Sequence, residues 1–285
     1  MIDRVDRIQV AVRDRRKAAA TFGALLGTIV VDERPSGVLG AVRLVLALGE
    51  SWIELCEPVE EGIASRTLSA RGEGLIAAGL SSGDVEGLAR RLAGLGQEPE
   101  REGDQLYLRP EQNYGMRYVI SPTRPARRVG PVSFLYEVTH TLLTDWRRVA
   151  AHDAGLFGLD PARFAPIASK RFGYQGTLAL FDPPDRLDRI ELAQVSGQDT
   201  PMGRWALKHG DSLYMCYGEA HDLQEIIARL EAAHARWTPH GESKTQEHDA
   251  LWVHPSALHG VLLGFSRTTQ GWQWSGRPDL VIRAH

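Results

Sequence analysis

The sequence predicts an α+β fold in which four βαβββ modules are arranged as two pairs. Two observations support this class. The chain of 285 residues is 43% hydrophobic and 24% charged, which is typical of a globular protein with room for two domains of ordinary size. In both halves the sequence also runs through a strand, a helix and further strands, and then repeats that order. The repeat within each half gives the four modules.

A segment rich in proline and arginine separates the two halves. SPTRPARRVGP, residues 121–131, contains three prolines and a glycine between two regularly patterned regions. We therefore predict a first domain at residues 1–122, a linker at 123–131 and a second domain at 132–285.

Each half opens with a strand and a helix. In the first half RIQVAV alternates as a strand does, and DRRKAAATFGALLG is a helical pattern that ends at Gly27. In the second half YEVTHTLL and DWRRVAAHDAGLFG repeat this order, with Gly158 at the end. Further strand-like segments follow: TIVVDERP and AVRLVLALG in the first half, and GTLALFD in the second.

These segments lead to an apolar strand that carries a glutamate in each half. The first strand is WIELCEP with Glu54, and the second is RIELAQV with Glu191. The second module of each pair then begins with a glycine-rich strand and a helix that an aspartate precedes, Asp84 or Asp222. Each half closes with a pair of strands, QLYLRPEQNYGMRYVISP and LWVHPSALHGVLLGF.

Composition excludes several classes of function. The formal net charge of −3 and the interspersed charges lack the basic stripe that nucleic-acid binding requires. No stretch approaches the 18 or so apolar residues that a membrane-spanning helix needs, so we expect no membrane partner. The two cysteines, Cys56 and Cys216, cannot form a disulfide framework, which favours a reducing compartment, the cytoplasm.

Three segments resemble the vicinal oxygen chelate superfamily, the group of glyoxalase I, methylmalonyl-CoA epimerase, extradiol dioxygenases and bleomycin-binding resistance proteins. They are VDRIQVAVRDRRKAAATFGALLG, IELCEP followed by GEGLIAAGL, and ELAQVSGQDTPMGRWALKHGDSLYMCYG. The resemblance implies that each pair of modules curls its strands into an open, cup-shaped mixed sheet with a site on the concave face. Four modules in one chain is the arrangement of extradiol dioxygenases.

Members of this superfamily usually hold a divalent metal with a histidine on the opening strand, Glu or Gln on the fourth, a histidine opening the second module and Glu on the last strand. The resemblance places two sets of residues at these positions: Arg7, Glu54, Ala77 and Tyr118 in the first half, and Val138, Glu191, Met215 and Gly264 in the second. Only the glutamates are retained. We therefore expect no metal cofactor.

Glu54 has two interpretations. It is an acid, base or hydrogen-bond acceptor of a first cup, or it is a carboxylate held by a buried arginine such as Arg7, because an unpaired buried charge is costly. The histidine-free first 139 residues offer little else for chemistry, which favours the structural interpretation. Cys56 is expected to be core filler.

Glu191 is the better candidate for chemistry. His140 lies two positions beyond Val138, and we expect it to face Glu191, since a histidine and a carboxylate within reach of one another suffice for acid/base catalysis near neutral pH. A structural hydrogen bond between the two is the competing interpretation. Met215, Tyr217 and Trp205 are expected to shape an apolar pocket, with Tyr214 on the opposite strand face. Val138 is expected to bind the substrate in this cup, as are Arg7 and Glu54 in the first cup. Trp272 and Trp274 are expected to pack a tail.

The sequence thus predicts a metal-independent enzyme of the isomerase or lyase type, with His140 and Glu191 as catalytic residues. Its substrate would be a small organic molecule that contains a carbonyl group. Two alternatives stay open. One is a protein that binds and sequesters a ligand. The other is an extradiol-dioxygenase-like enzyme that binds Fe, Mn or Zn through His140, Glu191 and a histidine from the 240–259 region. The chain is expected to be a monomer or a homodimer.

Overall fold

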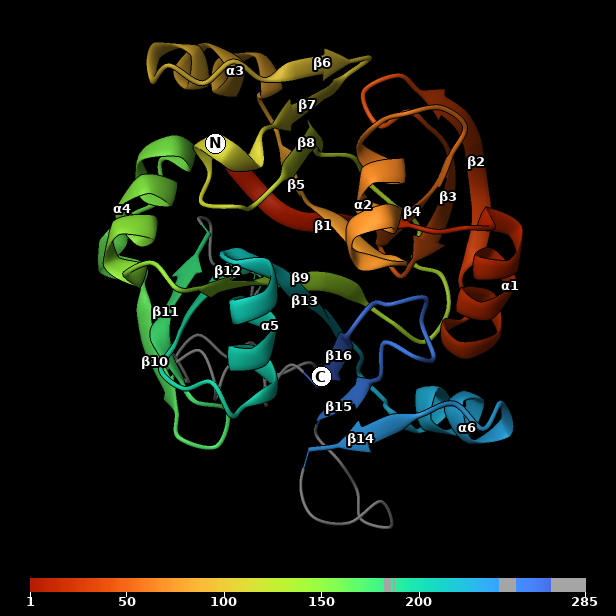
Figure 1. The fold of residues 1–285 in the computed structure, drawn as a ribbon. Coiled ribbons are helices and arrows are strands. Elements are labelled where there is room, and N and C mark those ends of the chain that lie inside the picture. The colour runs from red at the N-terminus through yellow and green to blue at the C-terminus, as the bar shows by residue number, and fades with distance from the viewer. Residues whose placement is uncertain (182–185, 187, 241–249, 268–285) are drawn as a thin grey trace.

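The computed structural model describes residues 1–181, 186, 188–240 and 250–267. Two mixed sheets of eight strands form its framework, one from each half of the chain (Figure 1). The first sheet has the order β2-β3-β4-β1-β5-β8-β7-β6, and the second has the matching order β10-β11-β12-β9-β13-β16-β15-β14. The predicted α+β fold of four βαβββ modules is therefore confirmed.

The strands of the first sheet are β1 (Ile2–Ala11), β2 (Ile29–Ser36), β3 (Ala41–Leu48), β4 (Ser51–Pro58), β5 (Gly74–Ser82), β6 (Glu100–Glu102), β7 (Gln105–Leu108) and β8 (Tyr118–Pro122). Those of the second are β9 (Phe134–Leu142), β10 (Ala165–Ser169), β11 (Tyr174–Leu180), β12 (Arg189–Val195), β13 (Ser212–Glu219), β14 (Trp237–Pro239), β15 (Ala250–Val253) and β16 (Leu263–Ser266). The helices are α1 (Arg15–Leu26), α2 (Ile63–Arg71), α3 (Val85–Gly94), α4 (Trp146–Phe157), α5 (Pro201–His209) and α6 (Gln224–Ala232), with short 3-10 turns η1 (Pro110–Gln112) and η2 (Pro161–Arg163).

Local signals in the sequence fix the first helix of each half. Asp14 accepts hydrogen bonds from the backbone at the start of α1, and Gly27 ends that helix with φ of 69°. Asp145 caps α4 in the same way, and Gly158 ends it with φ of 64°. The repeated sequence pattern therefore produces the same structure twice.

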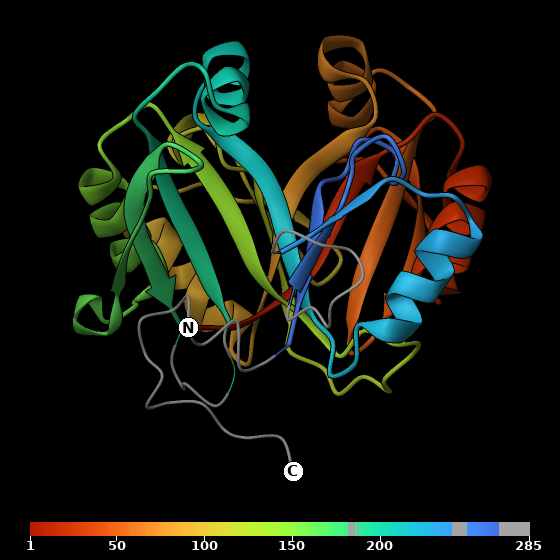
Figure 2. The ribbon, with the colours of Figure 1, turned by 90° about the horizontal axis from the view of Figure 1, so that it is seen from below.

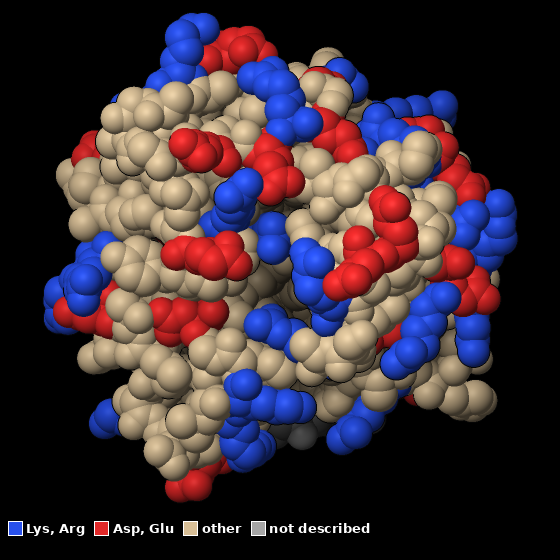
Figure 3. Space-filling model, turned by 45° about the horizontal axis from the view of Figure 1, so that its top comes forward, with Lys and Arg blue, Asp and Glu red and all other residues tan. Residues whose placement is uncertain are grey.

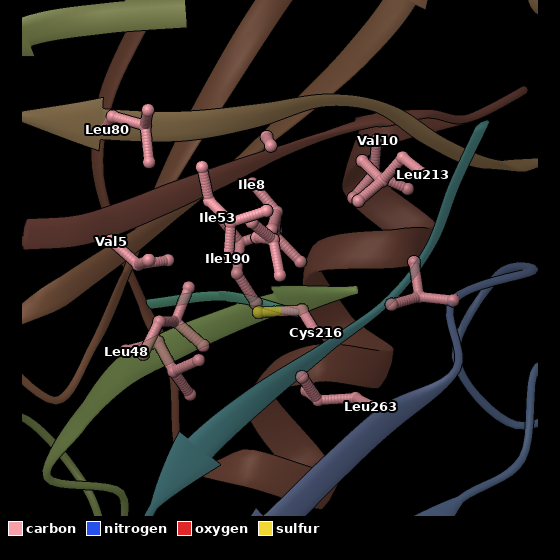
Figure 4. Close-up of a cluster of buried hydrophobic side chains, with 14 of the residues drawn as sticks. Val5, Ile8, Val10, Leu48, Ile53, Leu80, Ile190, Leu213, Cys216 and Leu263 are labelled. Carbon is pink, nitrogen blue, oxygen red and sulfur yellow. The ribbon is translucent and has the colours of Figure 1, made fainter. Parts of the chain in front are cut away.

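The main core lies between the two sheets. Ile8 and Val10 on β1 and Ile53 on β4 point to the same side of their sheet, where Figure 4 shows them beside Ile190, Leu213 and Cys216 of the second sheet. This face carries the hydrocarbon side chains, so the alternate residues of each strand point into a cup on the opposite face. Figure 2 shows the two curled sheets side by side, with helices on their outer sides.

Helices and loops of each half also contact the other half. Helix α6 of the second half lies against α1 of the first, and α3 of the first half lies against α4 of the second (Figure 2). The loop between β7 and β8 reaches the second half, where a Cβ on Gly115 would lie 1.7 Å from the Asp211 carbonyl oxygen. The equivalent loop between β15 and β16 contacts the first half, since a Cβ on Gly260 would lie 1.8 Å from the Glu73 carbonyl oxygen. We call these two loops, β7–β8 and β15–β16, the reciprocal loops.

Both reciprocal loops use the same backbone conformation. The residues before the glycines have positive φ values, 49° at Tyr114 and 48° at His259, and the glycines have 78° and 81°. A glycine suits such a position because it has no Cβ.

Charges of both signs are mixed over the surface. Figure 3 shows lysine, arginine, aspartate and glutamate side chains interspersed on one face, around a hollow near its centre. Within the described part of the chain, no helix has the length and apolar composition to cross a membrane.

Candidate functional site: two cups

The cup of the first half is filled by its own side chains. Glu54 is fully buried and forms ion pairs with Arg7 at 2.6 Å and with Arg43 at 3.3 Å. Gln9 donates a hydrogen bond of 2.7 Å to the same carboxylate, and Gln105 donates another of 3.3 Å. The concave face here is a closed polar network.

The environment of Glu54 keeps it ionised. Burial by itself would raise the pKa of this carboxyl, but the charges of Arg7 and Arg43 and the hydrogen bond from Gln9 outweigh that effect and lower the pKa to about 2. Cys56 is buried beside this network and its pKa is raised by burial, so it is a packed thiol. The structure thus matches the structural interpretation of Glu54, a carboxylate held by Arg7.

The cup of the second half contains a cavity of about 450 Å³. Strands β9, β12, β13 and β15 supply Glu137, Arg189, Glu191, Tyr217 and Trp252 to its wall. The described residues that complete the lining are Pro166, Ile167, Ala168, Ser169, Phe172, Tyr174, Leu178 and His240. A volume of this size suits a small organic molecule.

Glu191 lies on β12 with its side chain in this cup, where it is 8% exposed. Its Oε2 accepts a hydrogen bond of 2.6 Å from the Thr139 hydroxyl on β9, and the Tyr174 hydroxyl also hydrogen-bonds the carboxyl. Burial, with a smaller contribution from the charge of Glu137, raises the pKa of Glu191 to about 7. This carboxyl therefore exchanges its proton near neutral pH.

A buried ion pair lies beside Glu191. The Arg189 side chain, on the same strand two residues earlier, donates to the Glu137 carboxylate at 2.5 Å. The Arg189 guanidinium also lies 4.8 Å from the centre of the Tyr136 ring. Because Glu137 is already paired with Arg189, that arginine neutralises Glu191 only in part, consistent with the raised pKa of Glu191.

Aromatic side chains form the other wall. The Tyr217 ring stacks on Tyr136 at 6.1 Å, and the Trp252 indole N–H donates to the Tyr217 hydroxyl at 2.5 Å. The Phe172 ring meets the Trp252 ring edge-on at 6.2 Å. The predicted role of Tyr217 in shaping the pocket therefore fits its position.

His140 does not lie where the sequence analysis placed it. Its register partner on β12 is Leu192, whereas Glu191 pairs with Thr139, so His140 and Glu191 point to opposite faces of the sheet. The His140 ring is buried between the two halves, and its Nε2 lies 2.7 Å from the Tyr114 carbonyl oxygen. Burial lowers the pKa of His140 to about 4, so the ring is neutral. The prediction that His140 faces Glu191 is therefore wrong.

Two other predicted pocket residues also lie elsewhere. Val138 points into the core between the sheets, one residue out of phase with the cup. Trp205 lies on α5, where its indole N–H donates to the Ser212 hydroxyl at 3.0 Å, and it is not among the residues that line the cavity. Met215 does lie on the cup side, packed with Tyr136 and Tyr217.

Two further residues lie on another strand face than expected. The register between β13 and β9 shifts after Leu213, so strict alternation fails and Tyr214 packs with Met215 and Tyr217 on the cup side. The first residue of β8, Tyr118, packs in the core with its hydroxyl 3.4 Å from Asp153, and Val119 faces the first cup instead. Trp272 and Trp274 lie outside the described residues.

The residues at the superfamily's metal positions do not suit a divalent metal. Cross-strand pairing surrounds Glu191 with Thr139 and Met215 and places Gly264 on the last strand, and it surrounds Glu54 with Gln9 and Ala77. At these positions each cup offers one carboxylate, with hydroxyl, amide and thioether neighbours, which is a poor donor set for Fe, Mn or Zn. The alternative set through His140 fails because that ring points away from the cup. Over residues 1–181, 186, 188–240 and 250–267, no group of three or more His, Cys, Asp or Glu side chains is placed to hold a metal.

Several cup residues were missed by the sequence analysis, although a signal for them existed. Arg189 and Glu191 are two residues apart on one strand, so a charged pair on one strand face was readable from RIEL. Glu137 stands in YEV, one residue before Val138. Trp252 and Tyr174 carried no comparable signal, because their proximity to Glu191 depends on strand order.

Comparison with known proteins supports the fold. A scan of protein-family models and a search of curated protein sequences found no match. Among solved structures, a mutant of 4-hydroxymandelate synthase from Streptomyces coelicolor superposes with a TM-score of 0.73 at 13% identity, over 94% of this chain and 93% of that chain. A xylose isomerase-like TIM barrel/4-hydroxyphenylpyruvate dioxygenase fusion protein has a TM-score of 0.62 at 12% identity, over 94% of this chain and 49% of that chain.

Both similarities extend over the two halves together, so the chain shares the overall fold of these two structures. The fold that the resemblance to the vicinal oxygen chelate superfamily predicted, four modules in two pairs, is the fold observed.

Proposed function

We propose that the second cup is the active site of an enzyme that moves a proton on a small organic molecule, with Glu191 as the acid/base group. One observation carries this proposal. Glu191 is a buried carboxyl that faces a cavity of about 450 Å³ and has a pKa of about 7, where a proton-transfer group is most effective at neutral pH. No metal takes part in the proposed chemistry, because the donor set around Glu191 does not suit one.

The surrounding residues suggest how the reaction would run. In its ionised form Glu191 would remove a proton from a carbon next to a carbonyl group and later return it, which is the core step of isomerases and lyases. The Thr139 hydroxyl fixes the orientation of the carboxylate. The Tyr174 hydroxyl bonds the same carboxyl. Tyr217 lines the cavity, and its hydroxyl would donate a hydrogen bond to the developing enolate oxygen.

Exchange of carbon-bound hydrogen tests this proposal without a known product. The protein is incubated in D₂O with a panel of small ketones, aldehydes, 2-oxo acids and acyl esters, and ¹H NMR follows the loss of the C–H signal next to each carbonyl. We expect protein-dependent exchange with at least one class, faster as pH rises through 7. Glu191→Gln should slow exchange by about 100-fold or more, since it removes the base.

A carboxylate away from the cup provides the control. Glu86 forms an exposed ion pair with Arg101, so Glu86→Gln should exchange at the rate of the unmodified protein. Exchange that survives in Glu191→Gln contradicts the assigned role, and so does a complete absence of exchange across the panel.

The aromatic wall favours a second candidate, a protein that binds and sequesters its ligand. Phe172, Tyr174, Tyr217 and Trp252 all line the cavity and offer flat apolar surfaces for stacking. Binding without any exchange or conversion would favour this function over catalysis. For either function we expect a small-molecule partner, and the free cysteines Cys56 and Cys216 are consistent with the reducing cytoplasm.

A further inference from the structure

The charged residues around Glu54 in the first cup can be compared, position by position, with those around Glu191 in the second cup. Glu54 and Glu191 occupy the same position on β4 and β12, since Glu54 pairs with Gln9 and Glu191 pairs with Thr139. Each is therefore surrounded by equivalent positions on the neighbouring strands. Comparison of these positions shows which charged side chains are present in one cup and missing from the other.

Two arginines of the first cup have no counterpart in the second. Arg7 pairs with the residue two positions before Glu54, and the residue in the equivalent place is Glu137. Arg43 pairs with the residue two positions after Glu54, and its equivalent is Gly176. A side chain at Gly176 is excluded by the present backbone, because a Cβ there would lie 1.7 Å from the Leu192 carbonyl oxygen.

Among the described residues, the lining of the second cup therefore has more carboxylates than cations. Glu137 and Glu191 both line the cavity, and Arg189 is the one lysine or arginine among the described lining residues. It pairs with Glu137. When Glu191 ionises, the described part of the cavity wall carries one negative charge in excess. In the first cup, two arginines form ion pairs with the matching carboxylate, Glu54.

The walls around this charge suit a cation. Tyr174 and Tyr217 line the cavity together with Phe172 and Trp252, and the face of an aromatic ring attracts a cation. The cup already contains one such contact, the Arg189 guanidinium over Tyr136 at 4.8 Å. Carboxylates combined with aromatic walls are a common way to recognise amines and quaternary ammonium groups.

We infer that the second cup binds an organic cation, an amine or quaternary ammonium group on an apolar body, and that this cation takes the place that the arginines occupy in the first cup. The inference rests on the proposed use of this cup as the ligand site and names the class of its ligand. It requires no turnover, so it can fail or succeed independently of the proposed chemistry.

Two compounds of the same shape and different charge test the inference. Benzyltrimethylammonium and its neutral carbon analogue neopentylbenzene are titrated into the full-length protein, and binding is followed by tryptophan fluorescence and saturation-transfer NMR. At pH 8.5 we expect the cation to bind at least about tenfold more tightly than the neutral analogue, a ratio in the range of cation–π and ion-pair attraction combined. Benzylsulfonate, the anionic member, should bind more weakly than either.

Protonation of Glu191 should reduce this preference. The groups that face Glu191 are Glu137 on β9, Arg189 on its own strand, Tyr174 on β11 and Tyr214 on β13, and His240 lines the same cavity. Between pH 8.5 and 5.5 the ratio should fall several-fold in the unmodified protein and change little in Glu191→Gln. A ratio near one at pH 8.5, or a pH dependence that Glu191→Gln retains, would overturn the inference.

A second variant separates aromatic recognition from charge. Trp252→Leu keeps an apolar wall but removes the indole face, so it should weaken the cation more than the neutral analogue. Equal loss for both compounds contradicts a cation site. A preference for the cation without hydrogen exchange on any carbonyl compound supports this inference against the proposed catalysis. Exchange that depends on Glu191 without any preference for the cation supports the catalysis and overturns the inference.

Discussion

At the residue scale, the two glutamates show how neighbours decide the behaviour of one side chain. Glu54 and Glu191 are both buried at the same place in their sheets, yet their pKa values move in opposite directions. Two arginines outweigh the cost of burial at Glu54, whereas Glu137 adds to that cost at Glu191. A carboxylate held in place and a carboxylate able to exchange a proton thus arise from the same strand motif.

Glu191→Gln should make stability less dependent on pH. The pKa of Glu191 is raised from 4.5 to about 7, so the folded protein holds this proton more tightly than the unfolded chain. Its contribution to stability is complete below pH 4.5 and is lost as pH rises through 7. The free energy of unfolding should therefore fall from pH 5 to pH 8 by up to about 3 kcal/mol more in the unmodified protein than in the variant. Urea denaturation at each pH measures this difference.

The difference between the unmodified protein and Glu191→Gln reports the titration of Glu191 alone. Burial also raises the pKa of Asp153 to about 7, but that effect is common to both proteins and cancels. Parallel stability curves of the two proteins across this range would contradict the assigned shift.

Glu54→Gln should behave differently from Glu191→Gln. It leaves the buried Arg7 and Arg43 without their shared carboxylate, and breaking a buried ion pair in this way costs about 3–5 kcal/mol. We expect a strong loss of stability at pH 7 with binding in the second cup unchanged. Equal denaturation midpoints for Glu54→Gln and Glu191→Gln would show that the two cups do not differ as described.

His140→Ala should affect stability and leave the second cup unaltered. The ring fills space between the halves and bonds the Tyr114 carbonyl, so its loss should cost about 2–4 kcal/mol. Ligand binding and hydrogen exchange, measured well below the denaturation temperature, should stay at the level of the unmodified protein. A loss of ligand binding or of hydrogen exchange in a stably folded His140→Ala protein would show that His140 contributes to the site.

At the element scale, the sequence was informative about strands and helices but not about how strands pair. Alternation in RIEL and capping at Asp14 and Gly27 are local, and they predicted the modules correctly. Whether Thr139 or His140 lies beside Glu191 depends on the register between strands some 50 residues apart, and a shift of one residue moves every side chain to the other face. Bulges in β9 and β13 add further shifts that no local pattern indicates.

The reciprocal loops give a prediction at the same scale. Gly115→Ala and Gly260→Ala each place a Cβ against the backbone of the opposite half, at a positive φ. Gly96 provides a matched control, because its φ is 76° and a Cβ there meets nothing within 4 Å. Gly96→Ala should cost about 1 kcal/mol from backbone strain alone. The loop variants should cost at least about 2 kcal/mol more, since the contacting backbone must move.

Thermal denaturation of the three variants checks this order. Similar melting temperatures for Gly96→Ala and Gly115→Ala would show that the loop of the first half does not press on the second half in solution.

At the scale of the whole molecule, the shared core makes the halves interdependent. Residues of both sheets form one buried cluster, and helices of each half cover the other. Neither sheet can therefore expose its core face without a large cost.

The two halves should unfold in one transition. Pulse-labelling hydrogen exchange with mass spectrometry during urea denaturation reports peptides of each half separately, and the two sets should share one midpoint. Midpoints that differ beyond error would show that the halves are independent domains.

The same interdependence has a consequence for the covalent connection between the halves. The reciprocal loops, the paired helices and the shared core all consist of residues outside the linker, whose residues Arg124 and Pro125 are exposed. Val129 and Gly49 exchange two backbone hydrogen bonds beyond that exposed point, so the second half keeps its anchor on the first. The two halves of the chain thus pack against one another as the subunits of a heterodimer do. Two separate polypeptides, divided after Pro125 and produced together, should assemble into the same structure by fragment complementation, with the cavity of the second cup intact.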